Sequence, residues 1–236
     1  MIGTIINVLA ILVGSALGLL LRRGLRQEVA DTVTQGLSLS VILVGVQGMI
    51  QTTNMLLVIL SMVFGGIIGA LLQIEKRMND LGAYAQRKLV RVSDESGAGN
   101  DFANGFVTAS LVFCIGAMAV VGSLNSGIRG DHSTLIAKAA LDGVASALFA
   151  STMGIGVMLS AVPVLVYQGS IALLGNAIAP FLSDAVVLEM SAVGGLLIVG
   201  LGVNMLLKQQ IKVANLLPAI FIPFLYFPIA RLLGGA

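Results

Sequence analysis

Apolar runs alternate with short polar segments along the chain, and most of the runs are about 20 residues long. A helix needs about 20 apolar residues to cross the hydrocarbon core of a bilayer. The pattern therefore predicts an all-α, polytopic integral membrane protein. We expect transmembrane helices at residues 2–21, 36–50, 55–74, 102–124, 135–153, 157–174, 192–207 and 213–233.

The positions of the basic residues favour these eight helices over seven, the alternative in which residues 135–174 form one span. Cytoplasmic loops of membrane proteins carry an excess of Lys and Arg. With eight helices, the links after the first, third, fifth and seventh helices share one side and hold most of the basic residues, including Lys208 and Lys212. We therefore expect both termini on the outer side of the membrane.

A weak internal repeat divides the single membrane domain, residues 1–236. The segment VILVGVQGMI at 41–50 resembles LLIVGLGVNML at 196–206 in pattern. Five helices precede the second unit, so it would enter the membrane from the opposite side. We expect three-helix units at 1–74 and 156–236 around a central pair at 102–155, an inverted-repeat plan found in many secondary transporters.

The longest polar segment, residues 75–101, separates the first unit from the central pair. Apolar residues recur at helical spacing from Ile74 to Leu89, which predicts an amphipathic helix at the cytoplasmic membrane surface. Residues 93–101 then predict a flexible loop, residues 24–35 a surface helix or turn, and residues 175–191 a turn segment that carries Asp184 and Glu189. The basic face of the amphipathic helix comprises Lys76, Arg77, Arg87, Lys88 and Arg91.

Composition excludes several classes of function. The chain is 57% hydrophobic and 10% charged, whereas a soluble domain has about 25% charged residues. A net charge of +2 without a long basic cluster argues against nucleic-acid binding. A single cysteine, Cys114, and a single histidine, His132, predict no disulfide within the chain and no metal site. Without an HExxH or phosphate-binding glycine motif, we expect neither an enzyme nor a bound cofactor.

The fifth predicted helix carries the strongest candidate for chemistry. Lys138 and Asp142 are the charged residues well inside a predicted span, and their spacing of four places them on one helix face, which Ser146 continues. A charge inside the bilayer costs roughly 2.5–3.5 kcal/mol even on the lenient insertion scale. The pair is therefore either a polar site or proton relay that faces the bundle interior, or a salt bridge that fixes helix packing.

Two amides and several glycines are further candidates. Gln47 and Asn204 occupy corresponding helices of the two units, where they would line a central cavity with Ser38 and Ser40, or form interhelical hydrogen bonds. Most of the 29 glycines would allow close helix packing, and flat glycine-rich faces would suit a homo-oligomer. The hinge candidates around the fifth helix are Gly116, Gly122, Gly154 and Gly156.

Three glycine-rich segments carry a resemblance to a known family. They are MIGTIINVLAILVGSALGLLL at the start, FCIGAMAVVGSLNSGIRGD at 113–131 and KAALDGVASALFASTMGIGV at 138–157. The chain resembles the bacterial YqgA/YdfK-like membrane proteins, the family of domain of unknown function 554, over essentially its full length. The resemblance implies a multi-pass protein of the bacterial inner membrane, and it implies no substrate.

A looser, architectural similarity links the chain to the ZIP metal transporters. It rests on the three-two-three order, the outward termini and the Asp142–Gly143 pair on the fifth helix. The ZIP family places histidines and acids on its fourth and fifth helices, whereas here the fourth helix has none and Lys138 would repel a divalent cation. The similarity is one of scaffold.

Together these features predict a secondary transporter of a small solute or ion. Asp142 would bind a proton or a polar substrate group, and Lys138 would tune it. The alternative is a non-transporting protein, an oligomeric scaffold or accessory subunit that engages its partner through the basic helix.

Overall fold

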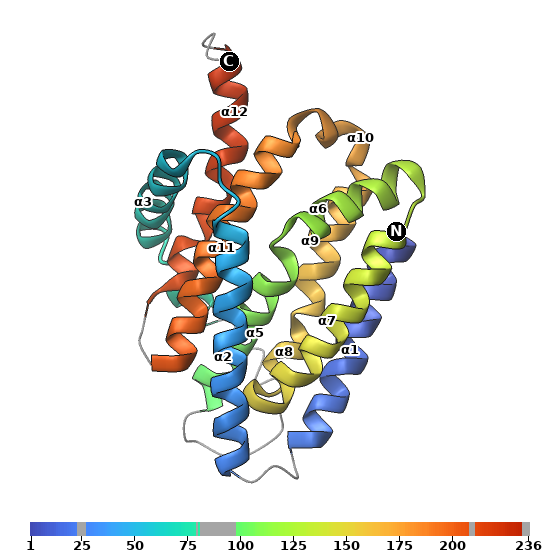
Figure 1. The fold of residues 1–236 in the computed structure, drawn as a ribbon, viewed down its shortest axis with the longest axis vertical. Helices are drawn as coiled ribbons and strands as arrows, with labels where there is room; N and C mark the ends of the chain where they lie inside the picture. Colours follow the sequence, from blue (N-terminus) through green and yellow to red (C-terminus); the bar gives the residue numbers. More distant parts are fainter. Residues whose placement is uncertain (23–26, 79, 81–97, 208–210, 233–236) are drawn as a thin grey trace.

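The computed structural model describes residues 1–22, 27–78, 80, 98–207 and 211–232, and the regular structure within these ranges is helical. Figure 1 shows the helices packed side by side in an elongated bundle. The elements are α1 (Ile2–Arg22), α2 (Gln27–Met49), α3 (Met55–Leu71), α5 (Ala98–Cys114), α6 (Ala117–Leu124), the π-helix η1 (Asn125–Arg129), α7 (Ser133–Met153), α8 (Gly156–Leu159), α9 (Ala161–Leu173), α10 (Gly175–Ile178), the 3₁₀-helix η2 (Ala179–Phe181), α11 (Asp184–Leu207), the 3₁₀-helix η3 (Val213–Phe221) and α12 (Ile222–Leu232).

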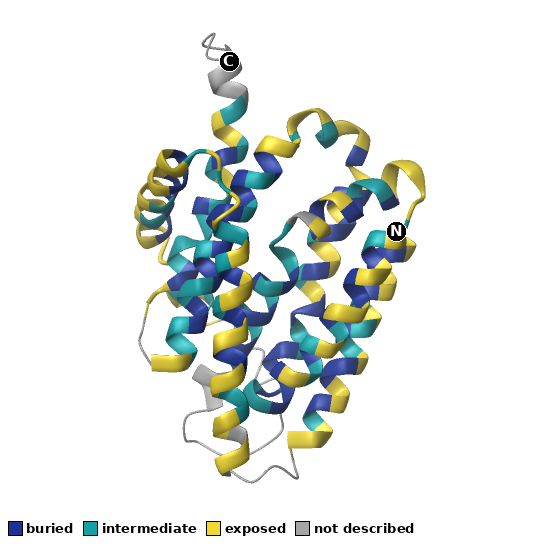
Figure 2. Cartoon of the chain, viewed as in Figure 1, coloured by how far each residue is buried: buried dark blue, intermediate teal, exposed yellow. Residues whose placement is uncertain are grey.

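The protein is an all-α polytopic membrane protein. Among the described residues, five helices are long and apolar enough to cross a membrane, or six if the bent pair 102–114 and 118–129 forms one span. Two shorter apolar helices, Met55–Leu71 and Val213–Phe227, correspond to the remaining two expected spans. Figure 2 shows exposed residues along the outward faces of the helices, and many of these residues are large and apolar; Leu71 is 79% exposed and Leu43 68%. Such a surface suits the hydrocarbon of a bilayer.

Three helix pairs approach each other closely because one partner lacks a side chain. A Cβ at Gly14 or Gly18 of α1 would clash with the backbone oxygens of Gly143 and Ala147 of α7. A Cβ at Gly45 would similarly meet Gly195 where α2 crosses α11. Small residues at helix crossings are the usual means of close packing in membranes.

The third pair, α3 with η3, packs in the same way and runs antiparallel. Gly65 lies against Ala219 and Gly69 against Asn215, so residue numbers rise along one helix as they fall along the other. The helices α2 and α11 are also antiparallel, whereas α1 and α7 run in the same direction (Figure 1).

Two glycines with positive φ mark backbone breaks in the central pair. The axis bends by 58° between α5 and α6, where Gly116 has a φ of 127°. Gly154 has a φ of 81° and ends α7, and α8 begins at Gly156, so the expected break after residue 153 is present. Glycine suits both positions, because other residues rarely adopt positive φ. Gly122, by contrast, lies inside α6 against Leu135.

Several element bounds differ from those expected. The helix α2 begins at Gln27 and includes most of the polar segment 24–35, and α5 begins at Ala98 within the expected loop 93–101. The helix α11 begins at Asp184, so Glu189 lies on a helix and not in a turn. The eighth span begins as a 3₁₀-helix, which contains Pro218, a residue that interrupts α-helical hydrogen bonding.

The expected basic helix falls only partly within the described residues. Residues 74–78 are helical, and Lys76 and Arg77 are exposed there. Arg87, Lys88 and Arg91 lie outside the described residues, as does the amphipathic pattern beyond residue 80.

Candidate functional site

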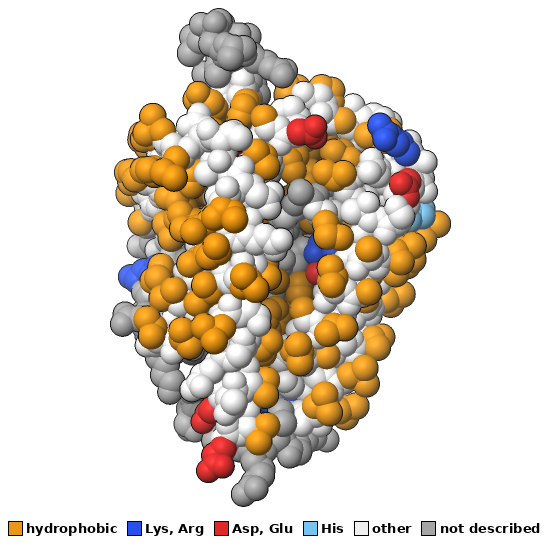
Figure 3. Space-filling view, viewed as in Figure 1, with side chains coloured by type: hydrophobic (Ala, Val, Ile, Leu, Met, Phe, Trp, Pro, Cys, Tyr) orange, Lys and Arg blue, Asp and Glu red, His pale blue; other side chains and the backbone are white. Residues whose placement is uncertain are grey.

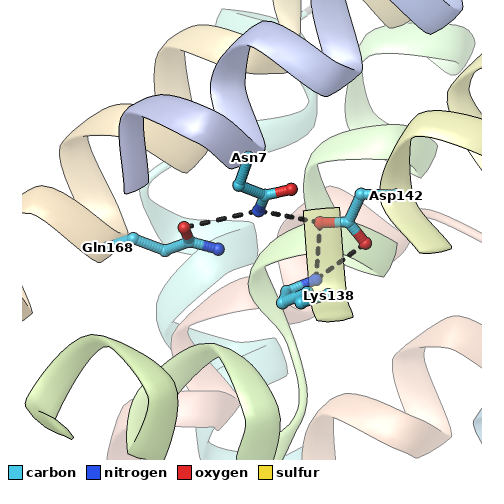
Figure 4. A network of polar contacts seen from close by, with 4 residues as sticks. All are labelled: Asn7, Lys138, Asp142 and Gln168. Carbon is cyan, nitrogen blue, oxygen red and sulfur yellow. Dashed lines mark hydrogen bonds and ion pairs between the residues drawn. The ribbon is translucent and has the colours of Figure 1, made fainter. Parts of the chain in front are cut away.

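A buried polar network joins α1, α7 and α9 (Figure 4). The Lys138 Nζ donates to Asp142 Oδ2 at 2.6 Å and to Oδ1 at 2.8 Å. Both side chains are almost completely buried, each residue being 6% exposed. The expected i, i+4 ion pair between Lys138 and Asp142 is therefore formed.

Two amides extend the network from neighbouring helices. Asn7 Nδ2 of α1 donates to Asp142 Oδ2 at 2.9 Å, and it lies 3.4 Å from Gln168 Oε1 of α9. Both amides are fully buried. The network thus brings together one cation, one anion and two neutral amides from three helices.

Each amide retains one unused polar atom. In the described structure, Asn7 Oδ1 and Gln168 Nε2 are buried and have no hydrogen-bond partner. Figure 4 shows the Asn7 oxygen on the side that faces Asp142 and the Gln168 nitrogen on the side that faces Lys138. A buried polar atom without a partner costs about 1–3 kcal/mol. The network therefore has one spare acceptor and one spare donor.

Close packing of α1 on α7 places these groups. Asn7, Ile11, Gly14 and Gly18 follow one another on the buried face of α1, at helical spacing. Gly14 and Gly18 let this face approach Gly143 and Ala147 of α7, and Asn7, about two turns before Gly14 on the same face, bonds to Asp142, the residue before Gly143. The same small residues that allow packing therefore determine the position of the polar site.

The molecular surface is hollowed on one face of the bundle. Figure 3 shows this hollow between the α2–α11 pair and the α6–α7 region, and side chains of both charge signs lie within it. Most of the surrounding surface is apolar. The low exposure of Lys138 and Asp142 shows that the surrounding helices enclose the pair almost completely.

The other predicted site residues do not join the network. Ser146 Oγ is buried one turn after Asp142 and donates to Gly143 O of its own helix at 2.8 Å. The two amides predicted to share a cavity are apart, because α2 and α11 are antiparallel: Gly48 faces Gly195, whereas Gly202 faces Ile42. Gln47 is therefore far along α2 from Asn204, and its side chain is exposed.

Asn204 instead holds the chain that follows α11. Its Nδ2 donates to Ile211 O at 2.8 Å, and its Oδ1 accepts from Ile211 N at 2.9 Å. Nearby, Glu75 Oε2 accepts from Ala214 N at 3.1 Å, and Asn215 Oδ1 accepts from Glu75 N at 2.8 Å. A cavity of about 30 Å³, large enough for a water molecule, is lined in part by Glu75, Asn204 and Ala214. Ser38 and Ser40 bond to backbone oxygens of α2 itself.

A second carboxylate, Glu189 of α11, is fully buried. Its Oε2 accepts from Thr52 Oγ1 at 2.6 Å. Its Oε1 accepts from Thr53 N at 2.9 Å, Thr53 Oγ1 at 3.0 Å and Asn54 N at 3.1 Å. This carboxylate fixes the link before α3, whose first turn is capped by Asn54.

Sequence reasoning missed Asn7, Gln168 and the bonding of Glu189. A usable signal existed for the first two, because Asn7 is the one amide in residues 2–21 and Gln168 the one amide in residues 157–174. The weak repeat favoured Gln47 and Asn204 instead. Nothing in the sequence pairs Glu189 with residues more than 130 positions earlier.

The fold and this network define a class: a polytopic helical membrane protein with a buried ion pair inside its bundle. The model of the family described as "Protein of unknown function (DUF554)" matches residues 2–227, so the chain belongs to that family, as its glycine-rich segments had indicated.

Two curated relatives agree with this assignment. The chain is 31% identical over 227 residues to the "Uncharacterized membrane protein YdfK" of Bacillus subtilis (strain 168), with 94% of each chain covered. It is 32% identical over 221 residues to the "Uncharacterized protein YqgA" of Escherichia coli (strain K12), again with 94% of each covered. No solved structure matches the chain, so the architectural similarity to ZIP transporters stays a prediction.

Proposed function

We propose that this protein is a secondary transporter of a small solute or ion and that Lys138 and Asp142 form part of its binding site. The observation that carries the proposal is the buried ion pair with a spare acceptor and a spare donor beside it. Ionisable groups inside a membrane are costly and usually functional. A pair needed only for packing would gain stability from satisfied amides, whereas these amides are half satisfied.

The directions of the helices support a transporter architecture. In Figure 1, α1 and α2 run opposite to α9 and α11, respectively, and α3 runs opposite to η3. This is the relation expected for an inverted repeat of residues 1–74 and 156–236. In many transporters, such units move against each other around a site near the bilayer midplane. The α1–α7–α9 network lies between helices of both units and the central pair.

We further propose that the protein resides in the inner membrane with both termini outside. The distribution of basic residues supports this orientation. With Ser133 at the outer end, Asp142 lies about 14 Å along α7 from that end, at about 1.5 Å per residue, which is near the middle of a hydrocarbon core of about 30 Å.

Transport is tested with purified protein in proteoliposomes that are exposed to labelled amino acids, polyamines, carboxylates, sugars and inorganic ions. We expect one class to accumulate, and we expect Asp142→Asn to abolish its uptake while Asp184→Asn, the same change at an exposed site, retains it. If Asp142→Asn folds poorly, Lys138→Met with Asp142→Leu replaces it, because an apolar pair of similar size often preserves stability. The proposal is wrong if no class enters faster than in protein-free liposomes, or if the variant without Asp142 transports normally.

A further inference from the structure

The polar groups of the α1–α7–α9 network form two different ends. One end offers a positive charge and a neutral donor, Lys138 Nζ and Gln168 Nε2; the other offers a negative charge and a neutral acceptor, Asp142 and Asn7 Oδ1. The neutral atom at each end is buried and unpartnered in the described structure. Each end therefore matches one pole of a dipolar molecule.

From this arrangement we infer that the solute is a small zwitterion, a molecule with a carboxylate and an ammonium group separated by a few bonds, as in an amino acid. The inference rests on the proposed transport function and specifies its substrate class. The solute carboxylate accepts from Lys138 and Gln168, and the solute ammonium donates to Asp142 and Asn7.

Charge balance favours a zwitterion over a simple ion. Lys138 and Asp142 neutralise each other in the structure, where their charged atoms are 2.6 Å apart. A zwitterion that enters between them gives each charge a new partner, so that the site remains neutral with and without the solute. A lone cation or anion pairs with one residue and leaves the other charge unpaired and buried, which is strongly unfavourable.

The elements around the pair are suited to such an exchange. Lys138 and Asp142 lie on one helix, α7, whereas Asn7 and Gln168 lie on separate helices, α1 and α9. A solute bound at all four groups thus links α7 to helices of both three-helix units. A small solute is expected because both amides are fully buried.

The test measures binding to the purified full-length protein by the shift of its melting temperature. The probes are glycine, L-alanine, β-alanine and 4-aminobutyrate, compared with acetate, methylammonium and acetamide at equal concentrations. We expect at least one zwitterion to raise the melting temperature, and we expect neither acetate nor methylammonium, alone or mixed, to match it.

Variants assign the binding to the site. The double variant Lys138→Met with Asp142→Leu should abolish the shift of the melting temperature. Gln168→Leu and Asn7→Leu should each raise the dissociation constant of the zwitterion by at least about tenfold, the effect of losing one hydrogen bond to a charged group. Lys212→Ala and Asp184→Asn, both at exposed residues, should bind as the unchanged protein does. The inference is overturned if acetate or methylammonium alone gives an equal shift, if none of the zwitterions does, or if the double variant still binds.

The transport experiment separates failure of this inference from failure of the proposed function. If a non-zwitterionic solute is taken up and its uptake requires Asp142, the protein is a transporter, but its substrate is not a zwitterion. Binding of a zwitterion without uptake of any solute leaves the binding site in place and refutes the transporter.

Discussion

The molecule buries two carboxylates inside its helical bundle, and their surroundings differ. Glu189 accepts four hydrogen bonds from the link at residues 52–54, two of them from backbone N–H groups. In the described structure, Asp142 accepts from side chains, those of Lys138 and Asn7. One carboxylate is bound in part by backbone N–H groups of a link, the other by side chains, whose place the solute takes in our proposal.

The hydrogen-bond partners of the two carboxylates distinguish a structural role from a binding role more clearly than their burial does. By burial alone, Glu189 would be the stronger candidate, since it is 0% exposed and Asp142 is 6% exposed. Glu189, the saturated carboxylate in the sense that it accepts four hydrogen bonds, is bonded to the link that leads into α3. Loss of these bonds would disturb the start of that helix, which Asn54 caps. The network around Asp142 retains one acceptor and one donor without a partner in the described structure, which a bound solute could use.

Removal of the saturated carboxylate should have the largest effect on stability. Glu189→Ala leaves the donors of Thr52, Thr53 and Asn54 without an acceptor, and hydrogen bonds to charged groups contribute about 1.5–3 kcal/mol each, though not additively. We expect the free energy of unfolding in detergent to fall by at least about 4 kcal/mol. Glu28→Gln at the exposed start of α2 serves as control and should change it by less than about 0.5 kcal/mol.

The comparison would fail if Glu189→Ala were as stable as the unchanged protein and lost transport. In that case the carboxylate would serve the substrate and not the link.

The ion pair should behave differently when both partners are removed. Lys138→Met alone leaves a buried unpaired carboxylate and should lower the free energy of unfolding by about 3 kcal/mol. The double variant Lys138→Met with Asp142→Leu should recover to within about 1 kcal/mol of the unchanged protein, because no buried charge remains. Chemical denaturation of the single variants Lys138→Met and Asp142→Leu and of the double variant yields the coupling free energy between the two residues.

The functional outcome of the double variant then distinguishes the two roles of the pair. If the double variant is stable but neither binds nor transports a solute, Lys138 and Asp142 belong to a solute-binding site. A double variant that transports normally shows that the pair only fixed helix packing, and the non-transporting scaffold becomes the better hypothesis.

Most of the fold follows from hydropathy, because the bilayer requires long apolar helices with satisfied backbones. The helices α1, α3 and α7 lie within a few residues of their expected bounds. The polar segment 24–35 was expected as a surface helix or turn, and its continuity with the second span as α2 was not predicted, because helices continue beyond the apolar core. The polar start of α11 was missed, because Glu189 is compensated by residues remote in sequence. Hydropathy reports the cost of a buried charge and gives no indication of its partner.

The candidate site could be predicted on one helix and not across helices. The spacing of Lys138 and Asp142 shows their pairing directly. The contributions of Asn7 and Gln168 depend on how α1 and α9 pack on α7, which the sequence indicates only as single amides in apolar runs. The repeat instead favoured Gln47 and Asn204, and the antiparallel register of α2 and α11 separates them.

A glycine substitution tests whether packing positions the unsaturated network. Gly18→Leu would place a side chain against the Ala147 backbone and force α1 away from α7. Overpacking of this kind costs about 1–3 kcal/mol, and we expect binding to weaken further because Asn7 moves from Asp142. Gly36→Ala on α2 is the control, since no atom lies within 4 Å of the added Cβ, and it should leave the melting temperature unchanged or raise it. Equal binding by Gly18→Leu and Gly36→Ala would show that the network does not depend on the α1–α7 approach.

A third carboxylate, Asp131, is exposed to solvent, and its removal should have the smallest effect on stability of the three. It lies before α7, accepts from Ser133 N at 3.0 Å, and the Ser133 hydroxyl and N–H lower the pKa of its carboxyl below the ordinary 3.8. A lowered pKa in the folded state stabilises the protein above the ordinary value, and the contribution disappears as the pH falls through the folded-state pKa. Asp131→Asn should therefore lower the melting temperature slightly at pH 7, and the gap from the unchanged protein should close below about pH 3.8. A gap that does not narrow as the pH falls below 3.8 would show that the aspartate acts through shape and not through its charge. A gap as large as that of Glu189→Ala would remove the distinction between the exposed carboxylate and the buried one.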